Sequence, residues 1–251
     1  MTQRSDWEKL KYTFRRLMKL GSQGAAQGEA FYNTMYDTEG EYRRDFRDSM
    51  YLAVWSQVYR LLRQIPQAKV LEVGCGAGQF AGFLNFLGFG NYVKGFDLSS
   101  QAVEIARTRA PFNFIQANAC DPEAYQGDYN TVISLETLEH IPDDFAALKN
   151  FPPGAFLIAS LPDFEYESHY RWFTNARQIE KRYYRYIDIQ EIVKVESWHV
   201  VFGKVDPVAP SFLQRVFKTR SRVNTIFLWN RYIKSTLKIL IKPVIRAVFS
   251  R

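Results

Sequence analysis

The 251-residue sequence has little cysteine and no long apolar run. Its two cysteines, Cys75 and Cys120, lie far apart, so we expect no disulfide framework and favour a reducing compartment. No stretch of about 18 uncharged apolar residues occurs, which argues against a membrane-spanning helix. The stretch MTQRSDWEKLKY at the start carries charges and no apolar core, so we expect no secretory signal there. These absences favour a cytoplasmic protein.

Acidic residues are absent after Asp206, although ten of the 33 Lys and Arg residues lie there. Residues 1–206 therefore carry 23 basic against 26 acidic side chains, and the net charge of +7 arises from the tail. This asymmetry indicates two parts, a main body and a basic tail. With the helices expected before the sheet, the predicted division is an N-terminal helical lid (1–65), a central domain (66–206) and a basic tail (207–251).

Apolar runs alternate with helical segments through the central domain. Continuous apolar strands separated by helices are typical of a parallel sheet that is covered on both faces. The last two runs predict closing strands, which we expect to be antiparallel. The sequence therefore indicates an α/β fold with a doubly wound, mostly parallel, seven-stranded sheet. The predicted strands are 69–73, 92–96, 112–116, 130–135, 155–161, 185–189 and 198–205, with helices at 79–87 and 100–109.

Helical spacing of apolar residues also predicts helices before the sheet. One should span residues 5–20, and a second should span 41–65 and end at Pro66. The glycine- and alanine-rich segment 21–30 should connect them.

The loop after the first predicted strand has glycine at every second position, in VLEVGCGAG (70–78). Ligands of a doubly wound sheet bind outside the carboxyl ends of the strands, and glycine lets a ligand approach the backbone closely. The spacing differs from the Gly-x-Gly-x-x-Gly of dinucleotide sites, so we expect a ligand that is not held by its phosphates. Asp97 ends the next strand, 25 residues after Glu72, where it can accept hydrogen bonds from ribose hydroxyls. Capping of the following helix is the alternative role for Asp97.

Six motifs follow one another in the order found in class I S-adenosylmethionine-dependent methyltransferases, which the chain resembles over residues 66–205. The closest resemblance is to the subgroup whose fourth strand ends in Leu-Glu-His. The resemblance implies a Rossmann-like fold and S-adenosylmethionine as the cofactor. The motifs are LEVGCGAGQF, GFDLS, NACDPEAY, YNTVISLETLEHIPDD, FPPGAFLIASLP and HYRWFT.

The same resemblance assigns roles around the cofactor. The glycine loop and Glu72 should surround the methionine moiety, Asp97 the ribose and Leu98 the adenine. Asn118 stands where the family usually has Asp, but its amide oxygen can still accept from the adenine amino group. Cys75 is interpreted as a packing residue. The expected cofactor residues are Glu72, Gly74, Gly76, Gly78, Asp97, Leu98, Asn118, Ala119 and Leu135.

The histidines are the candidate catalytic residues, because an alcohol acceptor needs a base or a Lewis acid. His140 and His169 follow the fourth and fifth strands, where the family places the acceptor, and we predict that one of them is the base. His199 alternates within a strand pattern and should be structural.

A metal site is the alternative at the same place. Glu136, Glu139 and His140 form a Glu-x-x-Glu-His arrangement that resembles the divalent-metal site of ubiquinone-pathway and small-RNA 2′-O-methyltransferases, with His169 as the later histidine. Leu-Glu-His also occurs widely in the superfamily without a metal, with the glutamate in a structural role. We therefore expect no resident metal ion.

Two segments outside the central domain are also candidates for binding, one near the cofactor and one at a membrane surface. In relatives, the Tyr-rich stretch before the first strand folds over the cofactor as a lid, so Tyr32, Tyr36 and Arg43 are candidates for contacts with the cofactor or the acceptor. The alternative is that these residues simply cover the sheet. Residues 224–250 place an apolar stripe and basic residues on one predicted helix, a pattern typical of a helix in a membrane interface. Packing of that stripe on the central domain or a partner, and binding of RNA, are the alternatives.

Membrane proximity leads to a hypothesis for the acceptor. We expect an O-methyltransferase at the inner face of the cytoplasmic membrane, bound to anionic lipid through 211–251. Its acceptor would be a sugar hydroxyl of a bacterial cell-surface glycan, with a glycosyltransferase as a potential partner. A prenylated quinone or another small molecule is the alternative acceptor, followed by RNA, although we do not expect nucleic acid. A non-catalytic scaffold is the alternative outside enzymes.

Overall fold

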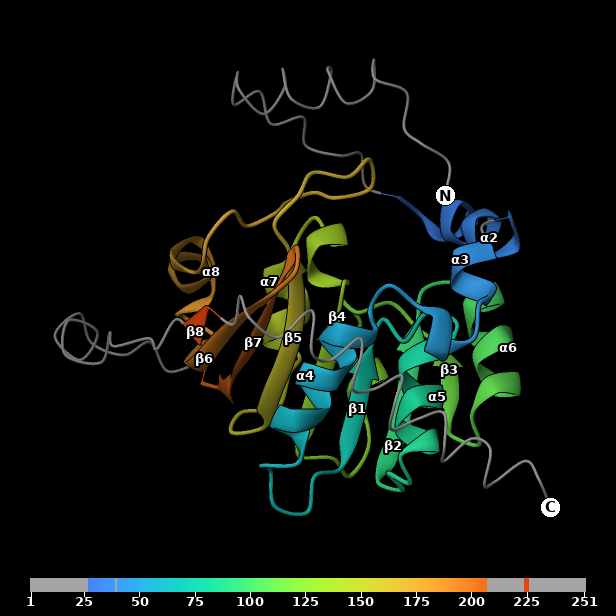
Figure 1. The fold of residues 1–251 in the computed structure, drawn as a ribbon, viewed down its shortest axis with the longest axis horizontal. Helices are drawn as coiled ribbons and strands as arrows, with labels where there is room; N and C mark the ends of the chain where they lie inside the picture. The colour runs from blue at the N-terminus through green and yellow to red at the C-terminus, as the bar shows by residue number, and fades with distance from the viewer. Residues whose placement is uncertain (1–26, 39, 207–223, 226–251) are drawn as a thin grey trace, which may run out of the picture.

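The computed structural model describes residues 27–38, 40–206 and 224–225. These residues build one sheet with the strand order β3-β2-β1-β4-β5-β7-β6-β8 (Figure 1). Strands β1 to β5 pair in parallel, whereas β7 is antiparallel to both β5 and β6. The strands are β1 (Val70–Val73), β2 (Tyr92–Asp97), β3 (Phe114–Gln116), β4 (Thr131–Leu135), β5 (Phe156–Pro162), β6 (Ile187–Val195), β7 (Trp198–Val205) and β8 (Asn224–Thr225).

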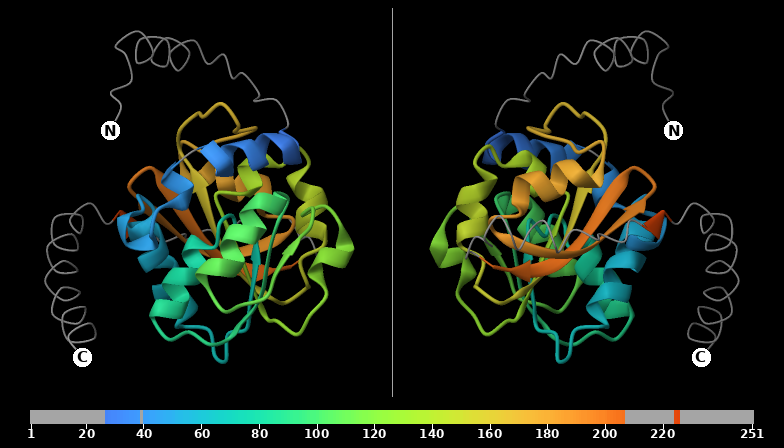
Figure 2. Two further views of the ribbon diagram at one scale, coloured as in Figure 1. Left: turned by 90° about the vertical axis from the view of Figure 1, so that its right-hand side faces the viewer. Right: turned by 90° about the vertical axis from the view of Figure 1, so that its left-hand side faces the viewer.

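Helices cover both faces of this sheet (Figure 2). Helices α4, α5 and α6 share an apolar core with one face, and α7 and α8 share a second core with the other. The helices are α2 (Glu29–Thr38), α3 (Gly40–Arg43), α4 (Leu52–Leu62), α5 (Gln79–Phe86), α6 (Ser100–Arg109), α7 (Asp144–Lys149) and α8 (Ala176–Tyr183), with 3-10 turns η1 (Phe46–Asp48), η2 (Pro122–Tyr125) and η3 (Leu138–His140).

Neighbouring residues of the central strands contribute to the two cores in turn. Ile133 of β4 and Ile158 of β5 face α4 and α5, whereas Val132 and Leu157 face α7 and α8. Side chains of a strand point alternately to opposite faces, so a sheet covered on both sides needs an unbroken apolar run. The predicted α/β fold with a doubly wound, mostly parallel sheet is confirmed.

The seven predicted strands are all present, and the tail adds a short eighth. Asn224 pairs with Val193, which makes β8 a parallel neighbour of β6. The helix predicted for 224–250 is therefore wrong at its first two residues, because these residues complete the sheet edge. The rest of that helix, and the helix predicted for 5–20, lie outside the described residues.

The single helix predicted for 41–65 is wrong, because the chain forms α3, η1 and α4 in turn. Asp45 caps η1 by accepting a hydrogen bond from the Arg47 amide at 2.9 Å. The Ser49 hydroxyl likewise accepts from the Tyr51 amide at 3.2 Å. Short polar side chains that bond the local backbone compete with a helix, so these two residues interrupt it.

Helix α4 belongs to the central domain, not to a separate lid. Its Val54 and Val58 lie in the same core as Val70 of β1. The predicted boundary at 65/66 therefore divides one core. Within the described part of the predicted lid, α2 and α3 lie over the strand ends. Helix α2 begins at Glu29, so the predicted connector 21–30 ends inside it.

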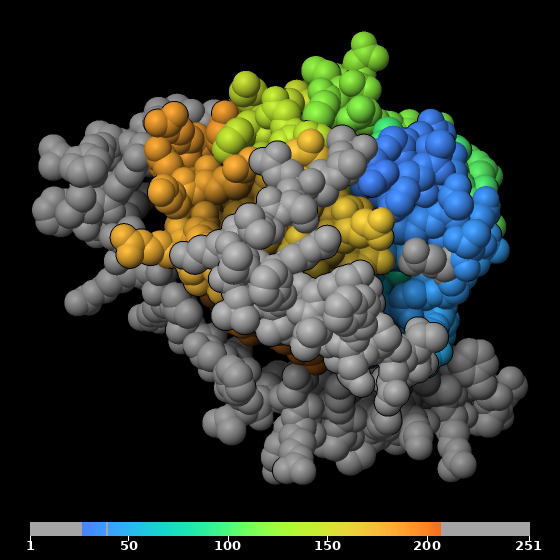
Figure 3. Space-filling model, turned by 90° about the horizontal axis from the view of Figure 1, so that it is seen from above, coloured from blue at the N-terminus to red at the C-terminus, as the bar shows by residue number. Residues whose placement is uncertain are grey.

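The topology brings several loops together at one end of the sheet. Strand β1 lies between β2 and β4, so the chain leaves β1 and β4 toward opposite sides of the sheet. A crevice forms at such a switch point. Helix α2 and the segment after β5 lie beside each other over this end (Figure 3). Among the described helices, not one combines the length and the apolar character that crossing a bilayer demands.

Candidate active site

A cavity of about 510 Å³ lies at the carboxyl ends of β1, β2, β4 and β5, with α2 along one side. Small-molecule sites usually measure about 300–1,000 Å³, so the cavity can hold a cofactor together with part of an acceptor. Of the eleven site residues predicted from the sequence, all except Gly78 line it.

The glycine loop (residues 74–78) needs glycine for steric reasons. Gly74 and Gly76 have φ of +71° and +51°. A Cβ on Gly74 would lie 2.3 Å from the Thr137 hydroxyl oxygen, and one on Gly76 would lie 2.8 Å from the Tyr36 hydroxyl oxygen. Without side chains here, the backbone itself forms the wall of the cavity.

Gly78 has a different role from the one predicted. It precedes α5 in a left-handed conformation, with φ of +71°. A Cβ there would lie 2.9 Å from the Cα of Ala106, so Gly78 lets α5 and α6 pack closely. The prediction that Gly78 contacts the cofactor is therefore not supported by its position.

Asp97 and Leu98 extend the wall from β2. One Asp97 oxygen accepts from the Gly76 amide and the other from the Ser99 amide, both at 2.9 Å. The side chain that caps α6 is Ser99, which accepts from the Ala102 amide at 3.0 Å. Asp97 therefore joins the glycine loop to β2 and does not cap the helix. Burial raises its pKa, although the amide donors oppose this effect.

Glu72 is 2% exposed and accepts a hydrogen bond from the Tyr92 hydroxyl. Burial raises the pKa of Glu72 to about 8, although the Tyr92 donor acts to lower it. Tyr92 stacks on Phe112 with ring centroids 4.6 Å apart. Tyr92 was not among the predicted site residues, because its role depends on a contact between two neighbouring strands.

The far wall comprises Asn118, Ala119 and Leu135. The Asn118 side-chain oxygen accepts from the Cys120 amide at 2.9 Å, which fixes the orientation of the amide group. Cys75 belongs to the glycine loop, lines the cavity and is buried in the apolar core, as expected of a packing residue.

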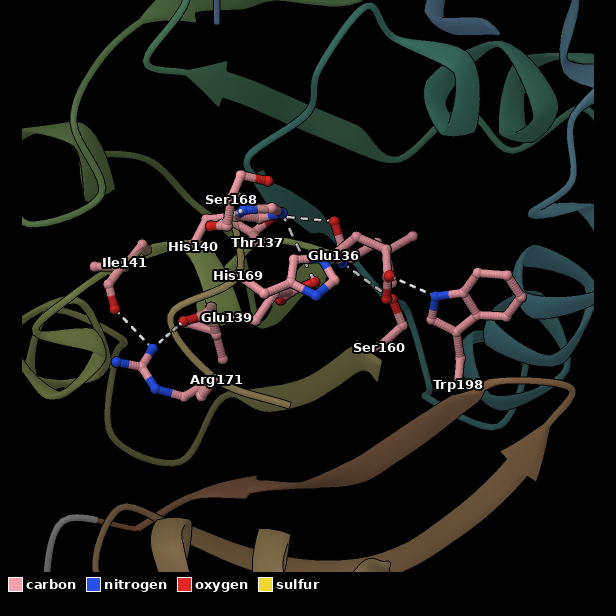
Figure 4. Close-up of polar contacts among 12 residues, drawn as sticks. Glu136, Thr137, Glu139, His140, Ile141, Ser160, Ser168, His169, Arg171 and Trp198 are labelled. Carbon is pink, nitrogen blue, oxygen red and sulfur yellow. Dashed lines mark hydrogen bonds and ion pairs between the residues drawn. The ribbon is translucent and has the colours of Figure 1, made fainter. Parts of the chain in front are cut away.

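His140 and His169 lie side by side, with ring centroids 4.9 Å apart (Figure 4). The Nδ1 atom of His140 lies 3.0 Å from the Ser168 carbonyl oxygen, and that of His169 lies 3.2 Å from the Phe164 carbonyl oxygen. Because a carbonyl can only accept, each Nδ1 carries the proton and each Nε2 keeps its lone pair. Burial lowers the pKa of both imidazoles to about 4, so both are neutral at pH 7.

Glu139 completes a cluster with these two histidines, here called the Glu-His-His cluster. One ligating atom from each of the three side chains lies within 4.8 Å of the others. Glu139 is 0% exposed, and neither carboxylate oxygen has a hydrogen-bond partner among the described residues. Burial raises its pKa well above the ordinary value. A buried carboxylate beside two imidazole lone pairs is a donor set suited to a divalent cation.

Arg171 holds the loop that carries this cluster, and sequence analysis noted it only inside HYRWFT. Its guanidinium donates to the carbonyls of Leu138, Ile141 and Pro142, the last two at 2.6 and 2.7 Å. Asp144 lies 3.4 Å away and balances its charge.

Glu136 lies at the cavity but outside the Glu-His-His cluster. Its carboxylate accepts from the Ser160 hydroxyl at 2.7 Å and from the Trp198 indole N–H. Its φ of +50° is rare for a residue with a side chain. Burial raises its pKa to about 7, against the opposing effect of the two donors.

The lid residues separate into two groups. Tyr32 and Tyr36 line the cavity from α2. Arg43 does not line it, because its guanidinium donates to the Tyr36 carbonyl at 2.8 Å and to Asp37 at 3.0 Å. A direct contact of Arg43 with the cofactor is therefore not supported by its position. His199 lies within β7, as predicted.

Residues 44–197, more than half of the chain, match the family model described as a methyltransferase domain. The chain belongs to this methyltransferase family. The ubiquinone biosynthesis O-methyltransferase of Pectobacterium carotovorum strain PC1 is 31% identical over 149 residues, which cover 55% of this chain and 60% of that protein. The protein of the same name from Thiobacillus denitrificans is 36% identical over 105 residues, 37% of this chain and 43% of the relative. The chain thus spans less than two thirds of the length of these relatives.

A solved methyltransferase has the same fold. The magnesium protoporphyrin IX methyltransferase from Synechocystis PCC 6803, determined with bound S-adenosylmethionine, superimposes with a TM-score of 0.52 at 17% identity. The match covers 72% of this chain and 99% of that one. At this identity the likeness concerns the fold alone.

S-adenosylmethionine is the cofactor of this methyltransferase family, and the cavity fits it on two counts. The glycine loop removes the Cβ atoms that would fill the space beside Tyr36 and Thr137. Asp97 presents a carboxylate, held by two amides, at the strand end where ribose hydroxyls are bound in such sheets.

Proposed function

We propose that this methyltransferase methylates a phenolic hydroxyl of an aromatic acceptor. The observation that supports this most directly is the Glu-His-His cluster, which lies among aromatic rings beside the cavity that the glycine loop lines. The relatives carry the name of O-methyltransferases of ubiquinone biosynthesis. That name supports the quinone-type acceptor, which was the alternative to a sugar hydroxyl.

The side chains around the two histidines favour a flat, apolar acceptor. The Tyr32 ring lies 6.2 Å from that of His140, and the rings of Phe164 and Tyr166 each lie 5.5 Å from that of His169. Aromatic rings pack favourably against one another edge to face or offset. A sugar would instead need several directed polar partners.

The reaction places two demands on this chain, to align the acceptor oxygen and to remove its proton. S-adenosylmethionine supplies an electrophilic methyl group on a positively charged sulfur, which keeps its bonding electrons when the methyl leaves. The cavity must hold the acceptor oxygen in line with that methyl group, since positioning provides much of the rate. The hydroxyl proton must also leave, because a neutral hydroxyl is a weak nucleophile.

The histidines alone are poor acceptors for this proton. A phenol has a pKa of about 10, whereas the imidazoles of His140 and His169 have pKa values of about 4. This gap opposes full transfer of the proton to either imidazole before the methyl group arrives. The cation-assisted alternative is therefore better supported than histidine acting as a base without a metal ion.

Glu139, His140 and His169 are the residues that would hold such a cation. The Glu139 oxygens accept no hydrogen bond from the described residues, and together with the Nε2 lone pairs of the histidines they supply oxygen and nitrogen donors. A divalent ion there would lower the pKa of a hydroxyl next to it. The role of the protein is to keep both histidines neutral and oriented through the Ser168 and Phe164 carbonyls.

The test compares acceptor classes with the full-length protein. We expect methyl transfer to catechol, measured by mass spectrometry, and much less transfer to methyl glucoside. Chelation with EDTA should abolish transfer, and added Mn²⁺ should restore it. Transfer to the glucoside and not to catechol would contradict the proposed acceptor.

Membrane association is a separate prediction. Residues 211–251 lie outside the described residues apart from 224–225, and the expected glycan acceptor and glycosyltransferase partner depended on them. Each basic residue near an anionic surface contributes up to about 1 kcal/mol. Changing Lys234, Lys238 and Lys242 to Glu should therefore release the protein from anionic vesicles in a sedimentation assay. Failure of the wild-type protein to sediment with such vesicles at physiological salt would contradict this hypothesis.

A further inference from the structure

Glu136 stands apart from the residues that its sequence motif groups it with. The Glu-x-x-Glu-His spacing would make Glu136 and Glu139 joint ligands of one cation. In the structure Glu139 lies with His140 and His169, whereas the Glu136 side chain turns toward Ser160 and Trp198 (Figure 4).

Both Glu136 oxygens are already bound to the protein. Ser160 donates to one at 2.7 Å, and the Trp198 indole donates to the other. The Glu136 amide in turn donates to the Ser160 hydroxyl oxygen at 3.0 Å. The backbone of Glu136 is left-handed, a conformation that costs about 1–3 kcal/mol for a residue with a side chain and persists only when the surroundings enforce it.

The donors themselves are held firmly. Trp198 is 3% exposed, and its ring contacts Tyr51 and Phe164 with centroids 5.3 and 5.8 Å away. Ser160 is 1% exposed and lies in β5 directly beside β7. A swing of Glu136 to the cluster would leave a buried indole N–H without an acceptor, which is costly.

We infer that Glu136 is not a ligand of the cation site and that Trp198 and Ser160 hold it away from the Glu-His-His cluster. This inference rests on the proposed function, because it concerns the cation invoked there. The site then has three protein donors instead of four. Fewer protein ligands leave more coordination positions for oxygens of the acceptor. Trp198 and Ser160 are positioning residues in this arrangement.

The experiment measures Mn²⁺ binding by the full-length protein through the electron paramagnetic resonance signal of free Mn²⁺. Wild type should bind one Mn²⁺. Glu139→Gln should weaken binding about 100-fold or more, since loss of even an indirect partner of a metal site costs about 10–100-fold. Glu136→Gln is the matched change of the same charge in the same motif. It should change Mn²⁺ affinity far less than Glu139→Gln, because Glu136 contributes no atom to the Glu-His-His cluster.

Trp198→Phe tests the positioning role, because it keeps an aromatic ring and removes the donor. The freed Glu136 should then reach the cation and tighten Mn²⁺ binding about tenfold. Adding Glu136→Gln to Trp198→Phe should remove that gain. Ser160→Ala provides a second, smaller change with the same expected direction. S-adenosylmethionine binding by calorimetry checks that each variant is folded.

Three results would overturn the inference. One is an equal loss of Mn²⁺ affinity in Glu136→Gln and Glu139→Gln, and another is the absence of Mn²⁺ binding by folded wild type. The third is Mn²⁺ affinity that stays unchanged in both Trp198→Phe and Ser160→Ala. Methyl transfer is not needed for these measurements. If Mn²⁺ binding follows the expected pattern but no phenol is methylated, the proposed function is contradicted and the inference about Glu136 is not.

Discussion

Asp97 and Glu139 are carboxylates in the same site region, but their surroundings differ. Asp97 receives a backbone amide on each oxygen. Glu139 receives no hydrogen bond on either oxygen from the described residues. The cofactor half of the cavity, built on the glycine loop and Asp97, is thus internally complete, whereas the acceptor half, built on the Glu-His-His cluster, is not.

This difference indicates where a ligand has to contribute. A buried polar group without a partner costs about 1–3 kcal/mol, and more if it is charged. A protein can tolerate this cost when a bound ligand or ion provides the partner that the polar group lacks. The cofactor half can fold around its own hydrogen bonds, whereas the acceptor half keeps donor atoms free for something that binds.

The largest expected effect is a loss of turnover without a loss of cofactor binding, which tests whether the two halves of the cavity are separate. His140→Ala or His169→Ala should lower turnover about 100-fold or more, because each removes a donor atom from the proposed cation site. Calorimetry should find S-adenosylmethionine affinity nearly unchanged, because neither ring takes part in the Asp97 or Glu72 contacts. His199→Ala is the matched control, since His199 lies in β7 and is not a member of the cluster, and it should retain turnover. Equal loss of cofactor affinity in the first two variants would mean that the halves are not separate.

Asp97→Ala tests the cofactor half with the opposite pattern. Two backbone amides would lose their acceptor, as would the ribose hydroxyls expected there. S-adenosylmethionine should bind more weakly by about 1–3 kcal/mol, or about 5–150-fold in calorimetry. Mn²⁺ binding at the Glu-His-His cluster should not change. Unchanged cofactor affinity would remove Asp97 from the site.

Gly76→Ala tests whether the shape of the glycine loop matters beyond backbone strain. Its new Cβ would lie 2.8 Å from the Tyr36 hydroxyl oxygen, so S-adenosylmethionine should bind about tenfold more weakly, or about 1.4 kcal/mol. Gly88→Ala is the matched control, because Gly88 also has a positive φ, of +74°, but open space around it. That variant should lose some stability and keep its cofactor affinity. Equal weakening in both variants would assign the effect to strain alone.

The smallest effect concerns Glu72 and pH. Its pKa is about 8 in the folded protein and about 4.3 when unfolded. Between these values only the folded state holds the proton, so this group makes unfolding easier as pH rises from about 4.3 to 8. Glu72→Gln should therefore have a higher melting temperature than wild type at pH 8, by about 2–4 °C for each kcal/mol of added stability. The difference in melting temperature should disappear near pH 4.5. A difference in melting temperature between the variant and wild type that widens at low pH would contradict the raised pKa of Glu72.

The residues of the cofactor half could be proposed from the sequence because their signals are local, and all of them except Gly78 line the cavity. Glycine spacing and an acid at the end of the next strand both arise in the short stretch from Val70, where β1 begins, to Asp97, where β2 ends. The strand pattern was equally informative, since each buried strand is a short apolar run. The interrupted helix before Ser49 was missed because isolated capping residues in a helical pattern are weak signals.

The acceptor half was predicted less completely because it depends on contacts between distant segments. His140 and His169 were found from their places after β4 and β5, and the structure brings them together. The bond between Trp198 and Glu136 joins residues 62 positions apart, and no local pattern indicates it. Arg171 was visible only as one letter of a motif, since its three carbonyl partners depend on how the preceding loop folds.

The hydrogen bonds of Arg171 have a consequence for how this region moves. Arg171 binds three carbonyls of the loop after β4, the Tyr170 amide donates to the Glu139 carbonyl at 2.7 Å, and the Ser168 carbonyl binds His140. The loops after β4 and β5 are thereby cross-linked into one cooperative unit. A local opening that releases one histidine must also release the other, so this region would exchange its amide hydrogens as a single block.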